Sequence, residues 1–260
     1  QVDQTYRIPY LDNNYNDNPN MPSFILAFVD EALVGFLSIY ADEPHEAEVS
    51  IYVAPSYRCQ GISKDLLTEF EKISRRYQLT NIYFISEANF LDKHSYYWNE
   101  YTANVDDNEI WLEQNSCDVS LEVNSDLEVC LADQSLIQDI ARFQSLAFDS
   151  SLDHAEMYAR ESVLDENCLL YVLRKNGQIC GSCSVDISLG TNYLFGLAID
   201  EIFRGLGLGS HFVKFILNDL HQRNGRLCQI VVEVQNTGAL RLYQRLGFEK
   251  KSEIIYLKRK

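Results

Sequence analysis

Long apolar runs are absent from this sequence, and none approaches the roughly 20 residues that a membrane-spanning helix needs. The first residues, QVDQTYR, contain neither a basic nor an apolar stretch, so we expect no secretory signal peptide. They also contain no initiating Met, which suggests that upstream residues have been lost. Basic residues are scarce, because 22 Lys and Arg stand against 38 Asp and Glu and give a net charge of −16. This balance predicts no binding to nucleic acid or to an anionic membrane. It favours a cationic partner such as an amine, or serves solubility alone.

Cysteine and histidine are too scattered for a disulfide framework or a metal site. The seven cysteines are an odd number, and the five histidines show no ligand spacing, so no metal is expected. One pair, Cys180 and Cys183 in CGSC, matches a redox motif, but the surrounding QICGSCSVDIS predicts a β-strand. Residues three apart on a strand face opposite sides, so these thiols are not expected to meet. A reducing cytoplasm is the expected compartment.

The two halves of the chain contain an internal repeat with a constant spacing of 146 positions. The matched pairs are Arg58 with Arg204, Gly61 with Gly207, and Tyr97 with Tyr243. In each half an apolar strand leads into a turn, an aromatic-Arg pair, and a glycine that opens a helix. We therefore predict two related domains, residues 1–115 and 116–260, joined near residues 114–119. The sequence does not indicate an oligomeric state.

The second half predicts the order β-α-α-β-β-β-α-β-α-β, an α/β fold with a mixed, mostly antiparallel sheet flanked by helices. A helix over 135–148 has Leu136, Ile137, Ile140 and Leu146 at helical spacing. A second long helix, from residue 208 to about 221, has its core face on Phe212, Val213, Ile216, Leu217 and Leu220. Asn176-Gly177 predicts a hairpin turn, and SEIIYLKRK is expected to close the domain as a strand. The first half is shorter at its start, because only an Asn/Asp-rich stretch precedes a hairpin that turns at Asp30-Glu31. Either this half lacks the opening strand and helices, or they belonged to the lost upstream residues.

The segment FRGLGLGS, residues 203–210, has three glycines in five positions and suggests close approach of a ligand to the backbone. A Walker loop is excluded because no Lys precedes Ser210. A dinucleotide fingerprint is disfavoured, because Ser210 replaces its last glycine and the turn comes late in the domain. The remaining interpretations are a pyrophosphate cradle at a helix start and a tight strand-to-helix turn with no ligand.

A downstream segment decides between these interpretations. It runs from Val232 to Phe248 as VEVQNTGALRLYQRLGF. Together with Arg204-x-x-Gly207-x-Gly209 it resembles the GCN5-related N-acetyltransferase (GNAT) family, whose acyl-CoA loop reads Arg/Gln-x-x-Gly-x-Gly/Ala. The resemblance covers residues from about 119 to 260. The first half resembles the family more loosely, because Cys59 replaces a residue that is usually glycine and Ser63 replaces one that is usually glycine or alanine. We therefore expect two tandem GNAT-like domains, of which only the second holds a working cofactor site.

The resemblance implies an N-acetyltransferase that moves an acetyl group from acetyl-CoA to a primary amine, on a small molecule or a peptide. It implies that the strand residues pair with the pantetheine arm, that the loop holds the pyrophosphate, and that Asn236 contacts the arm. The implied cofactor-binding residues are Leu197, Ala198, Ile199, Arg204, Gly205, Leu206, Gly207, Leu208, Gly209, Ser210 and Asn236.

Tyr243 is the implied general acid for the CoA thiolate, or alternatively a core tyrosine of an amphipathic helix. The general base stays open among Asp200, Glu233 and a water-relayed or substrate-assisted route, while Glu46 and Glu48 offer a base only in the first half. The rival function is a non-catalytic acyl-CoA sensor or protein-interaction module, which the eroded first half and the unassigned base favour.

Overall fold

The repeat is confirmed element by element in the computed structural model, which describes residues 5–7, 9, 11, 13, 16–104, 107–115 and 126–260. Strand β3 (Glu46–Val53) has the same length and place as β10 (Asn192–Ile199) at the 146-residue spacing. Helix α1 (Ile62–Tyr77) matches α5 (Leu208–Arg223) in the same way. Both halves therefore share their central strand, glycine loop and long helix.

Contacts divide the chain into two units whose limits differ from the two sequence halves. The first unit comprises the chain up to Ile110 together with Ser252–Lys260, and the second comprises Trp111–Lys251. Most of the last strand, β12 (Glu249–Arg259), thus packs with the first unit, whereas the sequence assigns it to the second. The division at residue 115 into two domains stays a prediction. Most of the expected junction, 116–119, lies outside the described residues.

The first unit is a mixed sheet in the order β1-β2-β3-β4-β12, with β5 paired to β12. Strands β3 and β4 run parallel, whereas the pairs β1–β2, β2–β3, β4–β12 and β5–β12 are antiparallel. No helix or strand occurs among its described residues before β1. Its remaining elements are β1 (Phe24–Val29), β2 (Ala32–Tyr40), β4 (Asn81–Glu87), α2 (Ala88–Lys93) and β5 (Tyr101–Ala103).

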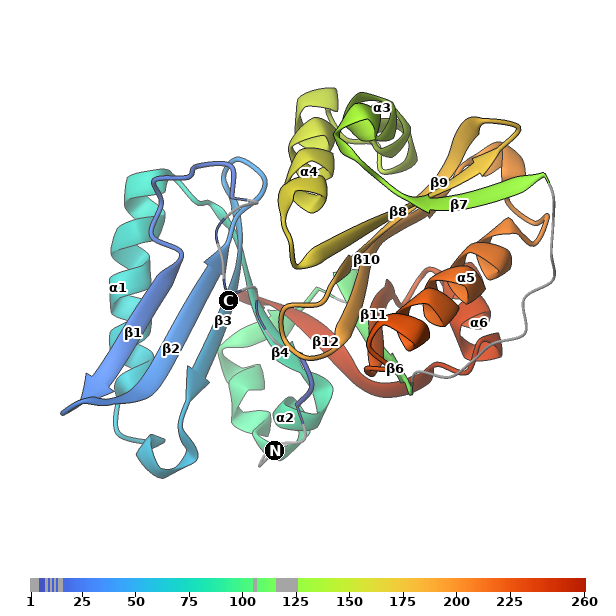
Figure 1. The fold of residues 1–260 in the computed structure, drawn as a ribbon. Coiled ribbons are helices and arrows are strands. Elements are labelled where there is room, and N and C mark those ends of the chain that lie inside the picture. Colours follow the sequence, from blue (N-terminus) through green and yellow to red (C-terminus); the bar gives the residue numbers. More distant parts are fainter. Residues whose placement is uncertain are drawn as a thin grey trace. The chain divides into compact units, whose positions relative to one another are not determined.

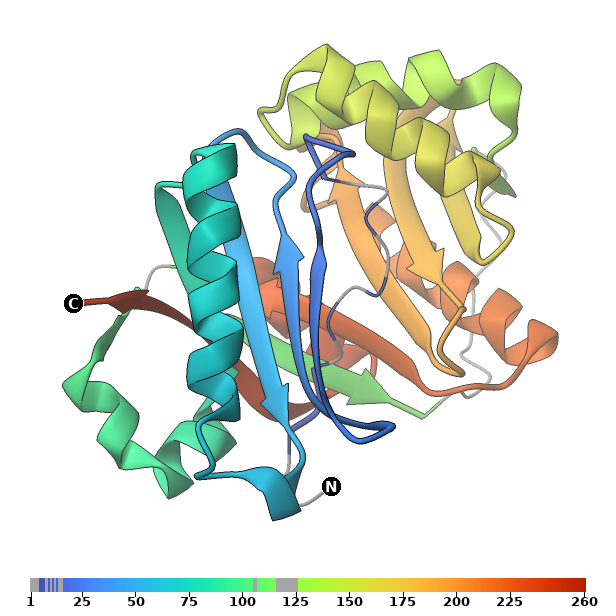
Figure 2. The same cartoon turned by 90° about the vertical axis from the view of Figure 1, so that its left-hand side faces the viewer.

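Helix α1 covers one face of this sheet (Figure 2). It buries Leu66 and Phe70 against Leu37 and Val49 of the strands, at 2 % exposure or less for each side chain. Because side chains alternate along a strand, the neighbours of Val49 on β3, Glu48 and Ser50, point to the face opposite α1. The first unit therefore has an apolar face under its long helix, and its other face carries Glu48 and Ser50 beside the stacked rings of Phe36 and Tyr52.

The second unit is a mixed sheet in the order β6-β11-β10-β9-β8-β7, with β10 and β11 parallel. Helices α3 and α4 lie against β8 and β9, and α5 lies on the opposite face (Figure 1). The turn at Asn176 and Gly177 is as predicted, and both residues have positive φ. Its remaining elements are β6 (Glu109–Gln114), β7 (Leu127–Leu131), α3 (Ile137–Ala147), α4 (Leu152–Leu164), β8 (Cys168–Lys175), β9 (Gln178–Asp186), β11 (Cys228–Glu233) and α6 (Thr237–Arg245).

The predicted core face of α5 is confirmed, since its five predicted residues are at most 1 % exposed. The predicted apolar face of α3 is correct at Ile137 and Ile140, which pack on Ala159 of α4 and Leu170 of β8. It is wrong at Leu146, whose side chain is 87 % exposed. Leu146 follows Ile137 by nine positions and so lies on the opposite side of α3, whereas Phe143 and Gln144 of the same part of the helix are buried.

The CGSC segment lies on β9, as its sequence predicts. Cys180 and Cys183 are both fully buried and both are free thiols. Their hydrogen-bond acceptors differ, because Cys180 donates to the carbonyl oxygen of Leu173 and Cys183 to that of Ser184. Among the described residues there is no group of three or more His, Cys, Asp or Glu side chains that could hold a metal ion. In the same part of the chain, no helix is both long and apolar enough to cross a membrane.

The glycine of CGSC has a packing reason, which leads to a stability prediction. A Cβ on Gly181 would lie 2.8 Å from Ile199 Cδ1 and 3.1 Å from the carbonyl oxygen of Ala198. Since the carbonyl belongs to the adjacent strand and cannot rotate away, Gly181→Ala should reduce the free energy of unfolding by about 1–3 kcal/mol. Urea denaturation measures this. Gly238→Ala is the control, because its Cβ would have 3.9 Å of clearance on a helix, where alanine is favoured by up to about 1 kcal/mol. Equal stability of the wild type and Gly181→Ala would contradict the packing argument.

Candidate functional site

Two parallel strands of the second unit separate at the place where the sequence locates the cofactor arm. The ladder between β10 and β11 runs from Asn192 with Cys228 to Leu194 with Ile230 and ends there. Beyond it, β10 bulges at Gly196, which has a φ of +58°, and continues beside β9. On their other edge, residues 197–199 are no longer paired with β11 by ladder hydrogen bonds. An extended ligand could therefore form backbone hydrogen bonds along this edge, as an added strand does.

The glycine loop follows directly and has a backbone path that glycine adopts most readily. Gly205 and Gly207 have φ values of +77° and +83°, and a Cβ on either would meet nothing within 4 Å. Helix α5 begins at Leu208 after Gly207, with no side-chain cap. The first amides of this helix lack intrahelical acceptors. Together with the helix dipole, they favour an anion such as a phosphate.

Arg204 shapes this loop. Its Nε donates to the carbonyl oxygen of Ile199 at 3.0 Å, and its Nη1 lies 3.1 Å from Glu201 Oε1 in an exposed ion pair. Asp200 caps the short turn between strand and loop by accepting from the amide of Ile202. The Arg204 guanidinium therefore holds the loop against the strand end, and the exposed pair adds little stability.

The other predicted loop residues differ in what they expose. Leu206 is 62 % exposed, whereas Leu208 is buried in the core, so Leu208 offers only its main chain to a ligand. A Cβ on Gly209 would lie 3.4 Å from Leu242 of α6, an ordinary contact, so the packing of α5 against α6 does not itself require glycine at this position. Ser210 is half-buried on the next position of α5.

Asn236 and Tyr243 both belong to α6 and its cap. The Asn236 side-chain oxygen accepts from the Ala239 amide at 3.1 Å, so it caps the helix. Tyr243 is 4 % exposed and meets Phe248 edge-on, with ring centroids 5.8 Å apart. Burial raises the pKa of the Tyr243 phenol above its usual value, and nearby Cys183 adds to the rise. The phenol therefore keeps its proton at neutral pH, as a general acid must.

The geometry does not assign the base to either carboxylate that the sequence offers in the second unit. Glu233 is exposed at the end of β11. The carboxylate of Asp200 is engaged as the cap of the preceding turn. The cofactor-binding and catalytic assignments made from the sequence stay predictions.

The first unit has the same loop backbone, although its sequence is eroded. Cys59 stands at the position of Gly205 and has a φ of +59°, and Gly61 has a φ of +89° at the position of Gly207. The short turns before the two loops also agree, since the capping residues Ala54 and Asp200 share φ −52° and ψ 134°. The erosion at Cys59 therefore changes a side chain and leaves the path of the loop intact.

A cavity of about 760 Å³ lies in the first unit beside this loop. Strands β3 and β4 pair only as far as Val49 with Phe84, and the cavity opens where they separate. Its lining includes Arg58, the amide-bearing residues 61–64 at the start of α1, and Tyr97. Tyr97, the counterpart of Tyr243 of α6, lies on the 3-10 turn Ser95–Asn99 after α2 and not on an α-helix. The residue types of this loop do not reveal the cavity, because Cys59 differs from glycine in its side chain but has the positive φ of a glycine.

These features coincide with one protein family. The family described as "Acetyltransferase (GNAT) family" matches residues 2–98 and 135–248, more than half of the chain. The chain belongs to the GNAT acetyltransferase family. Both matched regions contain a glycine loop, Arg58 to Gly61 in one and Arg204 to Gly209 in the other, so this is a tandem GNAT protein.

Characterised and uncharacterised relatives match one part of this GNAT protein. An uncharacterised N-acetyltransferase of Methanocaldococcus jannaschii is 29 % identical over 91 residues, which are 32 % of this chain and 40 % of the relative. The [ribosomal protein bS18]-alanine N-acetyltransferase of Escherichia coli is 27 % identical over 85 residues, 33 % of this chain and 57 % of the relative. The chain thus spans about half the length of the curated relatives it matches. Acetyl transfer, with acetyl-CoA as the usual donor, is the chemistry of this family.

Solved structures of tandem and single GNAT proteins share the fold. A tandem GNAT protein from the clavulanic acid biosynthesis pathway has a TM-score of 0.71 at 14 % identity, covering 92 % of this chain and 84 % of that one. A GCN5-related N-acetyltransferase from Sphaerobacter thermophilus has a TM-score of 0.69 at 18 % identity, and the match covers 91 % of this chain and 80 % of that one. At these identities the likeness establishes the fold alone.

Proposed function

We propose that this GNAT protein transfers the acetyl group of acetyl-CoA to a primary amine, and that the reaction takes place in the second unit. The observation that carries the proposal is the glycine loop of that unit, where Gly205 and Gly207 have left-handed angles and open space beside them at the start of α5. The loop would take the pyrophosphate, and the free edge of β10 the pantetheine arm. The same unit supplies a buried phenol, Tyr243, as proton donor.

In this reaction the amine nitrogen attacks the thioester carbonyl carbon, a C–N bond forms and the C–S bond breaks. The leaving thiolate takes a proton from the Tyr243 hydroxyl, and the proton that the amine loses passes through solvent and restores the phenol. The buried phenol is protonated at neutral pH, so its proton is present when the thiolate forms. The products are an amide and free CoA thiol.

The acceptor class follows from charge and from the relatives. A net charge of −16 favours a cationic amine. One relative acetylates an alanine of ribosomal protein bS18, which supports a peptide amine beside small-molecule amines. The six described cysteines are free thiols and suit a reducing cytoplasm.

Release of free thiol tests the proposal directly. Acetyl-CoA is mixed with the protein and a panel of amines that includes polyamines, amino acids, aminoglycosides and short peptides, and the free thiol is followed with a disulfide reagent. We expect at least one cationic amine to accelerate release far above the amine-free rate. No acceleration by any amine, with intact acetyl-CoA binding, would favour a non-catalytic acyl-CoA sensor.

A second function, acyl-CoA binding without transfer, is favoured for the first unit by its cavity. The cavity combines the start of helix α1 with Arg58 and Lys64, which suit phosphates, and its volume falls in the range of about 300–1,000 Å³ usual for ligand sites. Glu48, the residue placed to act as a base there, lies 3.1 Å from Arg7 in an ion pair. The Arg7 guanidinium favours the ionised carboxylate, whereas burial raises the pKa of Glu48, so binding without transfer is proposed for this unit on its cavity and its loop alone.

A further inference from the structure

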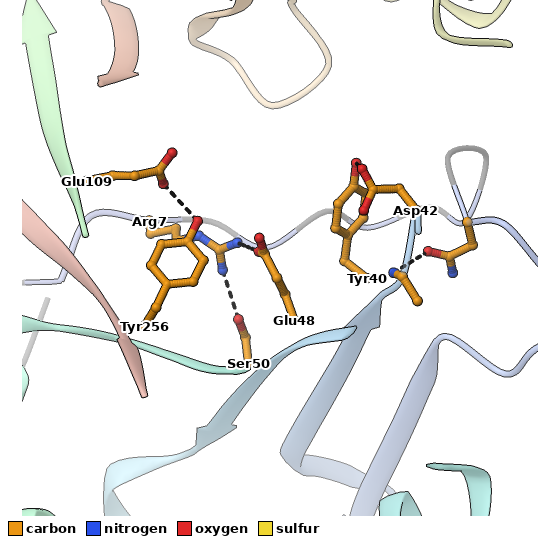
Figure 3. Close-up of polar contacts among 9 residues, drawn as sticks. Arg7, Tyr40, Asp42, Glu48, Ser50, Glu109 and Tyr256 are labelled. Atoms are coloured by element: carbon orange, nitrogen blue, oxygen red, sulfur yellow. Dashed lines mark hydrogen bonds and ion pairs between the residues drawn. The ribbon is translucent and has the colours of Figure 1, made fainter. Parts of the chain in front are cut away.

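A segment near the start of the chain, residues 5–7, lies along the first-unit cavity and is held there by side chains of β3 and β4. The amides of Tyr6 and Arg7 each donate to Glu87 Oε1 at 2.8 Å. The Arg7 guanidinium donates to Ser50 Oγ at 2.8 Å and to Glu48 Oε2 at 3.1 Å (Figure 3). Thr5, Arg7 and Glu87 all line the cavity. The segment is thus bound by groups distant from it in the sequence.

Glu87 is placed to receive a peptide backbone. It stands at the junction of β4 and α2 and is 4 % exposed, yet its side chain forms no cap on the helix that it precedes. Its carboxylate is directed to two consecutive amides of residues 6 and 7 instead. Recognition of consecutive main-chain amides does not depend on side-chain identity. This part of the site therefore recognises an extended peptide as such.

Glu48 and Ser50 supply the preference for a basic side chain. Both lie on the face of β3 away from α1, and the exposed fraction of the Glu48 side chain is 26 %. Asp42 and Glu46 lie close enough to add negative potential, and burial raises the pKa of Glu48 while the Arg7 guanidinium opposes the rise. Tyr256, on β12, donates to Glu109 beside this group (Figure 3). A half-buried carboxylate is costly in its ionised form without a cation, so a positive charge beside Glu48 stabilises that form.

We propose that Glu87, Glu48 and Ser50 form a binding site for an extended peptide with a basic side chain, and that residues 5–7 occupy this site in the unliganded protein. An external basic peptide then competes with the chain's own segment for the same five hydrogen bonds. Displacement of the segment would also remove one wall of the first-unit cavity, so peptide binding would change how accessible this cavity is to a ligand. The site does not depend on acetyl transfer in the second unit.

The test uses the fluorescein-labelled peptide QVDQTYRI, the chain's first eight residues, titrated into the full chain and followed by anisotropy. Arg7→Ala in the protein weakens the competing segment. Because an attached segment competes at an effective concentration in the millimolar range, the variant should bind the peptide at least about 10-fold more tightly than the wild type. A peptide with Ala in place of Arg should bind the Arg7→Ala protein about 10-fold more weakly than QVDQTYRI does. The double variant Arg7→Ala/Glu48→Gln should likewise bind QVDQTYRI about 10-fold more weakly than Arg7→Ala does.

Hydrogen exchange of the Tyr6 and Arg7 amides in the wild type is the second measurement, and it does not depend on how well a variant folds. Excess QVDQTYRI should accelerate the exchange of these two amides, whereas spermidine that supplies the same concentration of positive charges should not. The proposal is wrong if Arg7→Ala shows no binding up to about 1 mM peptide and the exchange is unchanged. It is also wrong if the Arg and Ala peptides bind alike.

Discussion

Replacing Tyr243 with phenylalanine should reduce kcat by roughly 10²–10⁴-fold, the usual contribution of a positioned general acid. The change removes one hydroxyl and keeps the ring, which packs edge-on against Phe248. Acetyl-CoA affinity should change less than about 3-fold, because the loop and the free edge of β10 are untouched. Steady-state kinetics with the best amine of the panel, together with direct acetyl-CoA titration, measure both quantities.

The matched control for this variant is Tyr97→Phe, which changes the corresponding residue of the first unit. Tyr97 lines the first-unit cavity but is not expected to act in transfer, so its kcat should stay within about 2-fold of the wild type. A decrease in kcat of roughly 10²–10⁴-fold in Tyr97→Phe, together with an unchanged kcat in Tyr243→Phe, would show that the reaction belongs to the first unit. Equal kcat for the wild type and Tyr243→Phe would remove Tyr243 from the acid role.

The pH dependence of the wild type follows from the same phenol. Its pKa is raised by burial, so the acid form required for proton donation persists through the neutral and mildly alkaline range. The amine acceptor must be neutral, so kcat/KM should increase with pH toward the pKa of the free amine. A loss of rate between pH 7 and about 9 would not fit a buried Tyr243 donor, whose ordinary pKa is already about 10.

The local elements of the second unit were readable from the sequence because each has its own local cause. The apolar strand before residue 200, the glycines at 205 and 207, and the apolar period of α5 fix strand, loop and helix within a few residues. The same holds for Asn176-Gly177, whose turn needs two positive φ values. These signals need no knowledge of distant parts of the chain.

What the sequence did not reveal depends on distant partners. The alternating pattern of β12 predicts a strand but not which strand it pairs with, and Ile254 pairs with Glu87 of the first unit. Cys59 was taken as a defect, whereas the fold holds it at a φ of +59° as it holds a glycine. The contacts of Arg7 with β3 span more than 40 positions and leave no pattern around residue 7.

Gly207→Val should eliminate transfer through the loss of acetyl-CoA at the second unit, with an expected decrease in affinity there of roughly 100-fold, or about 3 kcal/mol. Two effects add. A side chain at a φ of +83° strains the loop by about 1–2 kcal/mol or more. It also fills the open space beside the start of α5, which the phosphate needs. Acetyl-CoA titration and the thiol assay measure the two losses.

Gly61→Val is the matched control, because Gly61 has a φ of +89° and the same open surroundings at the start of α1. Both variants carry a similar strain, so a difference between them reports the ligand and not the stability of the fold. We expect two acetyl-CoA molecules per wild-type chain and one per variant, with kcat retained in Gly61→Val and lost in Gly207→Val. Retained kcat in Gly207→Val and lost kcat in Gly61→Val would move catalysis to the first unit. One molecule bound to the wild type, with Gly61→Val unaffected, would show that the first-unit cavity binds something other than acyl-CoA.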